Sequence, residues 1–248
     1  MKRLNILWIG LISVLMTACY DDYEKDYDES SVYFASQKPL RTLVADTDMS
    51  IKVGVAIGGK REVHTDDWAT FEIDPSLLDG TGLTLMPENY YQLANPNKMT
   101  ISNPNLAIAD VKVTFSDAFY NDDAALGKHY AIPFRLVDHN QDEVSTDVNG
   151  QLKDYSIVVV KFVSQYHGTY FVKGKVTNLS TQQVTEYNNK DLSQNMTRDF
   201  VSLGRNKLRR PGFGNTLENN ESVNLTVNPD ESVTIEAGGS VAIIDASA

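Results

Sequence analysis

Cysteine is almost absent from this 248-residue sequence, in which Cys19 is the only one. A lone cysteine cannot form a disulfide within the chain, so the folded part must depend on its apolar core. Basic residues are also scarce: 22 Lys and Arg stand against 33 Asp and Glu, for a formal net charge of −11. The sequence therefore lacks a basic surface that could neutralise phosphates, which argues against nucleic acid as a partner.

Long apolar runs are missing as well, apart from one at the start of the chain. This run extends from Leu4 to Met16 and follows the positive pair Lys2 and Arg3. It is too short and wrongly flanked for a stable membrane span, and it has the form of a secretory signal. We therefore predict a signal peptide over residues 1–18.

Cys19 directly follows the small residue Ala18, at the point where a bacterial lipoprotein signal peptidase cuts. We predict that Cys19 is lipidated and begins the mature protein. The alternative is an ordinary signal peptide in which Cys19 falls there by chance. When Lys2 and Arg3 are removed from the 22 basic residues, 20 remain against 33 acids, for a net charge near −13.

Residues 20–29 contain six acids and one base. Like charges repel and extend a chain, so we predict a lipidated acidic tether over residues 19–30. An acidic cluster directly after a lipidated cysteine also resembles the surface-export signal of Bacteroidetes lipoproteins. This resemblance implies an outer-membrane lipoprotein that faces the cell exterior; an anchor that faces the periplasm is the alternative.

Apolar and polar residues alternate with a period of two in much of the remaining chain, which is typical of half-buried strands. The alternating segments are residues 51–57, 69–73, 111–115 and 130–136. Residues 156–163 form a more continuous apolar run, which predicts a central strand. Residues 31–35 and 98–102 bring the number to about seven strands, so we predict an all-β sandwich over residues 31–164.

Two local signals accompany these strands. Asp74 followed by Pro75 predicts a brief helical turn over residues 74–79, with Asp74 as its cap. Pro133 lies inside a strand pattern, which predicts an edge strand or a bulge because proline cannot donate to a strand ladder.

A second β-rich domain is expected over residues 168–248. Its predicted strands are residues 169–177, 184–187, 199–203, 222–227, 232–237 and 240–244. Residues 209–214 (Arg-Arg-Pro-Gly-Phe-Gly) predict a loop. We expect this domain to be incomplete and to lack closing strands, which would leave an exposed edge.

The order of segments in the first domain carries a family resemblance. The quoted pieces include 53–59 (VGVAIGG), 69–78 (ATFEIDPSLL), 85–93 (LMPENYYQL) and 130–134 (YAIPF). Over about residues 30–163 the chain resembles the immunoglobulin-like N-terminal domain of Bacteroidetes surface lipoproteins of unassigned function. That domain also precedes chitinase-like endo-N-acetylglucosaminidases and lectin-like modules, and its genes often lie beside starch-utilisation-type outer-membrane transporters.

The resemblance implies an immunoglobulin-like β-sandwich in a component of a glycan-uptake apparatus. It supplies no catalytic residue, because this domain is not the hydrolytic part of those enzymes, and a fold alone does not determine function. More weakly, the segment from Gly168 resembles the β-rich C-terminal domain that accompanies the first domain in some members.

The residues themselves also argue against an enzyme. The acidic pairs Asp66-Asp67, Asp122-Asp123 and Asp142-Glu143 all lie in turn-rich stretches, where we expect solvated side chains. Nucleophile-elbow, zinc-protease and phosphate-loop motifs are missing. We therefore predict no catalytic residue.

One segment has the spacing of a calcium loop. Asp138, Asn140 and Asp142 place oxygen ligands at every second position. The pattern then fails, because Glu143 stands where the loop needs glycine and Asn149 stands where it needs a bidentate Glu. A polar loop is the favoured interpretation, and since the four histidines show no ligand spacing we predict no metal site and no cofactor.

A glycan site would use aromatic faces beside polar groups. Trp68 is the only tryptophan after the signal peptide, and it is either an outward sugar platform beside Asp66-Asp67 or a cap on the end of the sandwich. Tyr90 and Tyr91 are the other candidate glycan-binding residues, although neighbours on a strand face opposite ways and at least one should be in the core.

A basic cluster stands out in this acidic chain: Arg205, Lys207, Arg209 and Arg210. It could contact an acidic glycan or a partner protein, but a solvated loop is the favoured interpretation.

These observations predict a non-catalytic cell-surface lipoprotein that binds a polysaccharide or oligosaccharide as an accessory of a polysaccharide-uptake system. The alternative is a spacer or docking module of an outer-membrane transporter complex, without a ligand of its own. A truncated remnant without function is a third interpretation.

Overall fold

The computed structural model describes residues 29–239, except for 48, 61 and 213–220. The predicted signal peptide, Cys19, almost all of the acidic tether and the predicted strand at 240–244 lie outside the described residues. Within them the predicted all-β fold is confirmed, since the one α-helix described, α2 (Asp117–Tyr120), has a single turn.

Eleven strands between residues 31 and 163 form one continuous sheet. They are β1 (Ser31–Tyr33), β2 (Leu40–Val44), β3 (Ser50–Gly58), β4 (Trp68–Ile73), β5 (Thr84–Leu85), β6 (Tyr91–Leu93), β7 (Lys98–Ile101), β8 (Ile108–Phe115), β9 (Tyr130–His139), β10 (Glu143–Val144) and β11 (Tyr155–Val163). The order is β10-β1-β3-β8-β7-β4-β9-β11-β2, while β5 pairs with β9 and β6 with β8. We call this unit the N-terminal sandwich.

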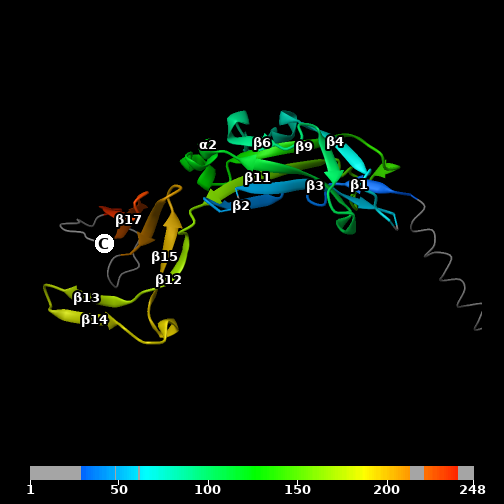
Figure 1. Ribbon diagram of the computed structural model, residues 1–248. Helices are drawn as coiled ribbons and strands as arrows, with labels where there is room; N and C mark the ends of the chain where they lie inside the picture. Colours follow the sequence, from blue (N-terminus) through cyan, green and yellow to red (C-terminus); the bar gives the residue numbers. More distant parts are fainter. Residues whose placement is uncertain (1–28, 48, 61, 213–220, 240–248) are drawn as a thin grey trace, which may run out of the picture.

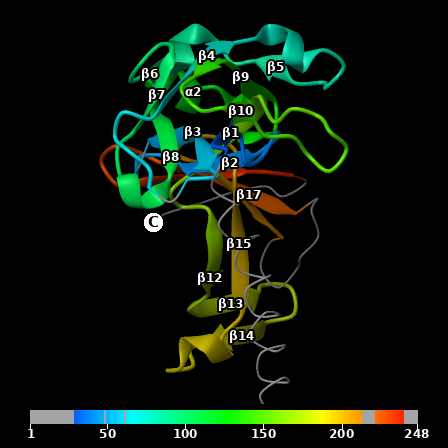
Figure 2. The same cartoon turned by 90° about the vertical axis from the view of Figure 1, so that its right-hand side faces the viewer.

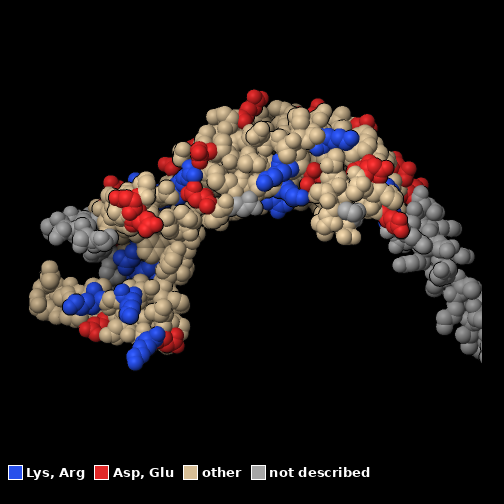
Figure 3. All heavy atoms as spheres, in the orientation of Figure 1, with Lys and Arg blue, Asp and Glu red and all other residues tan. Residues whose placement is uncertain are grey.

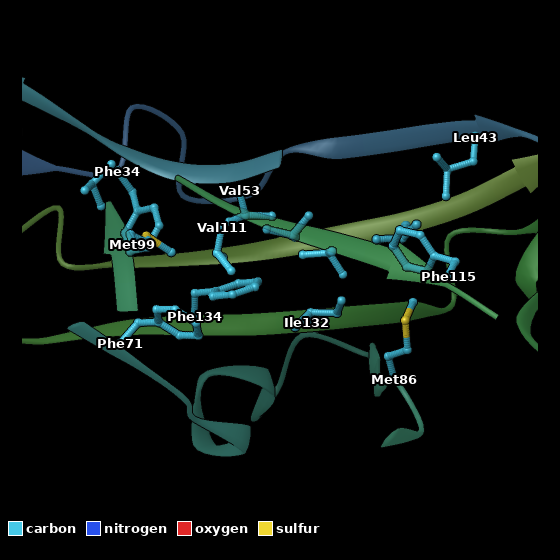
Figure 4. Close-up of a cluster of buried hydrophobic side chains, with 14 of the residues drawn as sticks. Phe34, Leu43, Val53, Phe71, Met86, Met99, Val111, Phe115, Ile132 and Phe134 are labelled. Atoms are coloured by element: carbon cyan, nitrogen blue, oxygen red, sulfur yellow. The ribbon is translucent and has the colours of Figure 1, made fainter. Parts of the chain in front are cut away.

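Strand β7 converts this one sheet into two layers. It pairs with β8 on one side and with β4 on the other, so the sheet turns over at β7 and its two halves face each other. Val53 and Val111 from β3 and β8 point toward Ile132 and Phe134 from β9 (Figure 4). Since these side chains come from the apolar positions of the alternating segments, the period of two in the sequence is the period of the core.

The strands that the sequence pattern did not predict are short or bury few side chains. We expected about seven strands, and the sandwich has eleven. Strands β5 and β10 have two residues each, and β2 at the edge has one buried residue in five. A segment that buries so little carries no alternation from which it could be recognised.

Short 3₁₀ helices connect several strands: η1 (Pro75–Leu78), η2 (Glu88–Tyr90), η3 (Pro104–Leu106) and η4 (Asp123–Leu126). The predicted turn after Asp74 is confirmed as η1, whose first free N–H, that of Ser76, donates to the Asp74 side chain.

The prediction for Pro133 was wrong. Strand β9 is an interior strand that lies between β4 and β11, and its register shift lies between Thr70 and Phe71 of β4, not at Pro133. Proline is tolerated there because β4 pairs with β9 only up to Ile73, opposite Phe134. The missing N–H of Pro133 therefore costs no ladder bond, while its carbonyl accepts from the N–H of Asp74 at 3.0 Å.

The chain after residue 167 forms two smaller sheets. A five-stranded antiparallel sheet has the order β12 (Gly168–Phe171), β15 (Thr197–Ser202), β16 (Lys207–Pro211), β17 (Ser222–Val227) and β18 (Val233–Ala237). Strands β13 (Gly174–Asn178) and β14 (Gln183–Tyr187) form a separate hairpin, followed by η5 (Leu192–Gln194). Figures 1 and 2 both show this hairpin at the end farthest from the N-terminal sandwich.

Two predictions for this part were wrong. Residues 169–177 are not one strand, because β12 ends at Phe171 and the separate hairpin begins at Gly174, which has a φ of +148°. Residues 209–214 do not begin as a loop, because Arg209 and Arg210 belong to β16 and pair with β17. The Pro-Gly pair marks the end of that strand.

Among the described residues no helix is long and apolar enough to cross a membrane.

Candidate functional site

A cavity of about 590 Å³ lies on one face of the five-stranded sheet and is open to solvent. Its lining residues are Tyr166, Tyr170, Phe171, Val172, Lys173, Arg198, Phe200, Leu208, Arg210, Leu225, Val227 and Val233. We call it the aromatic cleft. A volume of this size is typical of small-molecule pockets, which span roughly 300–1,000 Å³.

Strand register brings the cleft residues together from distant parts of the sequence. Side chains two apart on a strand share a face, so Arg198 and Phe200 of β15 point the same way. Tyr170 of β12 lies opposite Arg198. On the other side of β15, Ser202 lies opposite Leu208, which places Leu208 and Arg210 of β16 on this same face.

The aromatic rings in the cleft are exposed and held in place. Tyr170 packs edge-on against Phe200, with ring centroids 5.4 Å apart and planes at 87°. The Tyr170 hydroxyl donates to the carbonyl of Tyr166 at 2.9 Å. Tyr170 and Phe171 nevertheless remain 46% and 51% exposed, so aromatic surface stays available to a ligand.

Cationic side chains accompany the rings. Arg198 is 4% exposed, and burial together with the nearby charge of Arg198 lowers the pKa of Arg210 from its ordinary value. Lys173 lies at the rim, and none of the twelve lining residues is acidic. Figure 3 shows Lys or Arg atoms facing the hollow between the five-stranded sheet and the β13–β14 hairpin.

Trp68, the first predicted platform, is half-buried at the start of β4 in the N-terminal sandwich. Its backbone N–H donates to the side-chain oxygen of Asn140 at 2.9 Å, and the Lys98 ammonium lies 4.9 Å from its ring centroid. The ring is thus partly covered by Lys98 through a cation–π contact. The glycan-binding role of Trp68 stays a prediction.

The carboxylates beside Trp68 differ from each other. Asp66 is exposed, but Asp67 is 2% exposed, so our prediction of a solvated pair was wrong for Asp67. Burial alone would raise the pKa of Asp67, yet its bonds from the Lys60 ammonium at 2.6 Å, the His64 N–H and the Gln141 amide lower it. Asp67 therefore holds its loop together and is not available to a sugar.

Tyr90 and Tyr91 both pack against the core of the N-terminal sandwich. The hydroxyls of Tyr90 and Tyr130 donate to the same oxygen of Asp122, at 3.0 and 2.6 Å. These bonds, of which that from Tyr130 has the larger effect, lower the pKa of Asp122. The same bonds to Asp122 are the main reason why the pKa of both tyrosines is raised, and burial adds to the effect.

The predicted aromatic residues do not form one site. Tyr90 contacts Tyr130 at the start of β9, whereas Trp68 bonds to Asn140 just after its end. Ten residues of strand separate these contacts, which corresponds to about 30 Å. The glycan-binding roles of Tyr90 and Tyr91 stay predictions.

The basic cluster was expected to be a solvated loop, and this prediction was wrong. The Arg205 guanidinium bonds to Asp46 and Asp117 of the N-terminal sandwich. The other three residues lie on β16, where Lys207 is 3.8 Å from Glu236 and Arg210 enters the aromatic cleft. Alternation on β16 divides the cluster between two faces of the sheet.

The segment with calcium-like spacing uses its oxygens within the protein. Asn140 accepts from the Trp68 N–H, and Asp142 accepts from the N–H and hydroxyl of Ser30. In the part of the chain that the structure describes, no group of three or more His, Cys, Asp or Glu side chains could hold a metal ion.

Comparison with solved structures shows where this fold occurs. A Bacteroides ovatus protein of unknown function matches with a TM-score of 0.71 and 21% identity, over 86% of this chain and 79% of that one. At this identity the likeness shows the fold alone.

Two other structures are less similar. An auxiliary nutrient binding protein from Bacteroides thetaiotaomicron has a TM-score of 0.45 and 12% identity, over 82% of this chain and 71% of that one. EndoBT-3987 of the same species, solved with its Man5GlcNAc product, has a TM-score of 0.37 and 21% identity, over 56% of this chain and 32% of that one.

No curated protein matches the sequence of this chain. A family model whose description reads "-like, N-terminal domain" matches residues 27–143. Together with the Bacteroides ovatus structure, this match bears out the resemblance predicted from the order of segments: residues 27–143 are similar to this family of N-terminal domains.

Proposed function

We propose that this protein is a non-catalytic glycan-binding lipoprotein and that the aromatic cleft is its binding site. The observation that carries the proposal is an open cavity of about 590 Å³ in which Tyr170 and Phe171 keep about half of their surface exposed. Sugar rings present C–H faces that pack on the electron-rich faces of aromatic side chains. Convergent polar groups beside such faces are what an oriented ligand requires.

The proposed location is the outer face of the outer membrane, through a lipid on Cys19. The lipoprotein signal and the six acids of residues 20–29 support this location. A Cys19→Ala variant should lose incorporation of labelled fatty acid and leave the membrane fraction. Replacing the six acids by alanine should keep the lipid but remove the protein from the reach of external protease.

Affinity electrophoresis of the mature chain through gels that contain plant, host or microbial polysaccharides tests the binding site. We expect one class of polysaccharide to retard the protein. Tyr170→Ala should weaken this retardation about tenfold or more, because it removes an exposed stacking face. Trp68→Ala tests the other predicted platform in the same gels.

Tyr33→Ala is the matched control, because Tyr33 is a half-buried surface aromatic on β1 with Lys153 over its ring. Binding that is lost in Trp68→Ala and kept in Tyr170→Ala would transfer the site to the N-terminal sandwich. If no polysaccharide retards well-folded protein, the glycan proposal is wrong.

A spacer or docking role in a transporter complex is the second candidate. It is favoured by the small size, about 100 Å³, of a cavity in the N-terminal sandwich that residues of β2, β3 and β11 line. It is also favoured by Arg205, which fixes this sandwich to the sheet that follows. Co-purification with an outer-membrane transporter in the absence of glycan, by a chain that binds none, would establish this role instead.

A further inference from the structure

We propose that the β13–β14 hairpin is the second wall of the aromatic cleft and closes over a saccharide bound there, with Gly174 as its hinge. This inference rests on the proposed function and adds how the site holds its ligand. In the part of the chain that the structure describes, the two strands of the hairpin pair only with each other. Figure 3 shows a hollow between the hairpin and the five-stranded sheet.

The connections of the hairpin place it beside the cleft. Strand β12 ends at Phe171, and the next residues, Val172 and Lys173, line the cleft before β13 begins. On the return side, residues 188–196 lead from β14 into β15, which contributes Phe200 to the cleft. A ligand in the cleft therefore lies next to both points from which the hairpin extends.

Strand register gives the hairpin two different faces. Directly opposite residues of an antiparallel pair share a face, and so do residues two apart on one strand. Val176 lies opposite Thr185, and Tyr187 is two residues farther along β14, so these three side chains share one face. They are partly buried, whereas every other residue of the two strands is exposed. We call this the inner face of the hairpin.

The inner face is turned toward the cleft. Burial and the charge of Arg198 lower the pKa of Arg210, and Tyr187 acts in the opposite direction and raises it. Tyr187 therefore lies near Arg210, which lines the cleft from β16. A sugar ring stacked on Tyr170 would thus meet a second, largely apolar surface, and two such walls bury more of a ligand than one.

Gly174 suits a hinge because only its backbone conformation requires glycine. Its φ is +148°, and an added Cβ would meet no atom of the described residues within 4 Å. The other connection is closed on itself, since the Asn195 side chain accepts from the N–H of Asn189 at 3.0 Å and donates to its carbonyl at 3.3 Å. Rotation at Gly174 can therefore move the hairpin as one unit.

The hairpin has little of its own to hold it in place. A two-stranded hairpin alone is only marginally stable in water. Leu179 at its turn and Val184 on its outer face are 80% and 51% exposed, so neither adds much buried apolar surface. Contacts between a bound saccharide and the inner face would therefore be a large part of what keeps the hairpin closed.

Hydrogen exchange tests the closure directly. The mature chain is measured alone and with dextran, laminarin, yeast mannan or polygalacturonate. With a polysaccharide that binds, at about ten times its Kd, exchange in β13 and β14 should slow about tenfold, because the open hairpin loses the ligand contacts. Strands β3 and β8 of the N-terminal sandwich are the internal reference and should not change. Tyr170→Ala should remove the protection together with the binding.

A shortened chain tests what the hairpin does for binding. Gly174 and Tyr187 lie opposite each other, so two glycines in place of residues 175–186 can join them as a tight turn and leave β12 and β15 where they are. On immobilised polysaccharide this variant should still associate but dissociate about tenfold faster, since a closing wall acts on release.

Point variants on the two faces of the hairpin provide matched controls. Val176→Ser on the inner face should speed dissociation severalfold, while Val184→Ser on the outer face should change it less than about twofold. Gly174→Ala should weaken binding about fivefold or more, because alanine rarely adopts this φ. Its control is Gly150→Ala, at a residue of the N-terminal sandwich that also has positive φ and open space around an added Cβ.

The outcomes separate this inference from the proposed function. If the shortened chain binds and dissociates like the wild type, or if Val176→Ser and Val184→Ser behave alike, the closing hairpin is refuted and the glycan site remains. Faster association without faster dissociation would also refute it, because the hairpin would then obstruct the cleft. Absence of binding to any polysaccharide by the wild type would refute both.

Discussion

Arg205 joins the two halves of the molecule, and its replacement is the sharpest test of how they are held. It lies in the turn between β15 and β16, yet both of its acidic partners belong to the N-terminal sandwich. Its Nε donates to Asp46 Oδ1 at 3.0 Å, and its Nη1 donates to Asp117 Oδ1 at 2.8 Å. The guanidinium carbon also lies 5.7 Å from the ring centroid of Tyr120.

The expected magnitude follows from how exposed each partner is. The side chains of Arg205 and Asp46 are 24% and 28% exposed, and their contact is a two-pronged charged hydrogen bond. Such a bond contributes about 1.5–3 kcal/mol. Asp117 is 74% exposed and adds little, about 0.2–1 kcal/mol at most. Arg205→Ala should therefore weaken the fixed arrangement about 10- to 100-fold.

Small-angle scattering and urea unfolding of the mature chain measure this effect. In Arg205→Ala we expect a broader range of interdomain distances and an earlier loss of the five-stranded sheet. Arg205→Lys should restore only part of the effect, because lysine keeps the charge but lacks the planar fork. Cleavage by protease between residues 164 and 168 should become faster.

Lys207→Ala is the control, since Lys207 is 46% exposed and pairs only loosely with Glu236 inside its own sheet. If Arg205→Ala leaves the scattering profile and the urea midpoint like those of Lys207→Ala, the reasoning is wrong. The interface would then be held by other contacts, such as the bond from the Ser164 N–H to the Ser202 hydroxyl.

Three further predictions concern the N-terminal sandwich. Because its bonds, above all that from Lys60, keep the folded pKa of Asp67 below the unfolded value near 3.8, the stability from Asp67 is present above that pH and is lost as the pH falls below it. Asp67→Asn should lower the urea midpoint at neutral pH. Below about pH 5 the midpoint of this variant should depend less on pH than that of the wild type, and parallel plots of midpoint against pH would contradict this. Asp122→Ala should lower the pKa of Tyr130, which its carboxylate raises, so that near-ultraviolet absorbance shows tyrosine ionisation at lower pH; an unchanged titration would show that the bond is not formed. Phe134→Ala should cost about 3–5 kcal/mol in urea unfolding, since this ring is fully buried in the core, and a loss under about 1 kcal/mol would mean that the core collapses around it.

The long strands could be predicted because each has one face on the core. In β8 the burial alternates from Ala109 to Phe115, as the alternation in the sequence requires. Side-chain hydrophobicity contains this information directly. Strands β2, β5 and β10 pair through backbone groups and bury few side chains, so the sequence carries little record of them.

Asp67 shows why a local pattern can mislead about a charged residue. In the sequence it is one of two adjacent acids in a turn-rich stretch, where solvated side chains are the rule. Its burial depends on the Lys60 ammonium and on Gln141, which is distant in sequence and arrives after β9. A buried carboxylate is tolerated only when such partners are in place, and pattern alone does not reveal them.

The aromatic cleft could not be predicted, because strand pairing assembles it. Tyr170, Phe200 and Arg210 stand far apart in sequence and meet through the pairing of β12 with β15 and of β15 with β16. The sequence offered one signal for the cleft, because Arg210, which lines it, belongs to the basic cluster. Interpreting those positions as a loop concealed it, because only in a strand does Arg210 share a face with Leu208.

The composition of the sheet face argues for a ligand rather than for an ordinary second layer. A sheet normally buries its apolar face against another layer. Yet after residue 168 the buried apolar residues among those described are Leu208 and Val223. The exposed rings of Tyr170 and Phe171 therefore fit the proposed ring-shaped ligand, whose apolar C–H faces can pack on them.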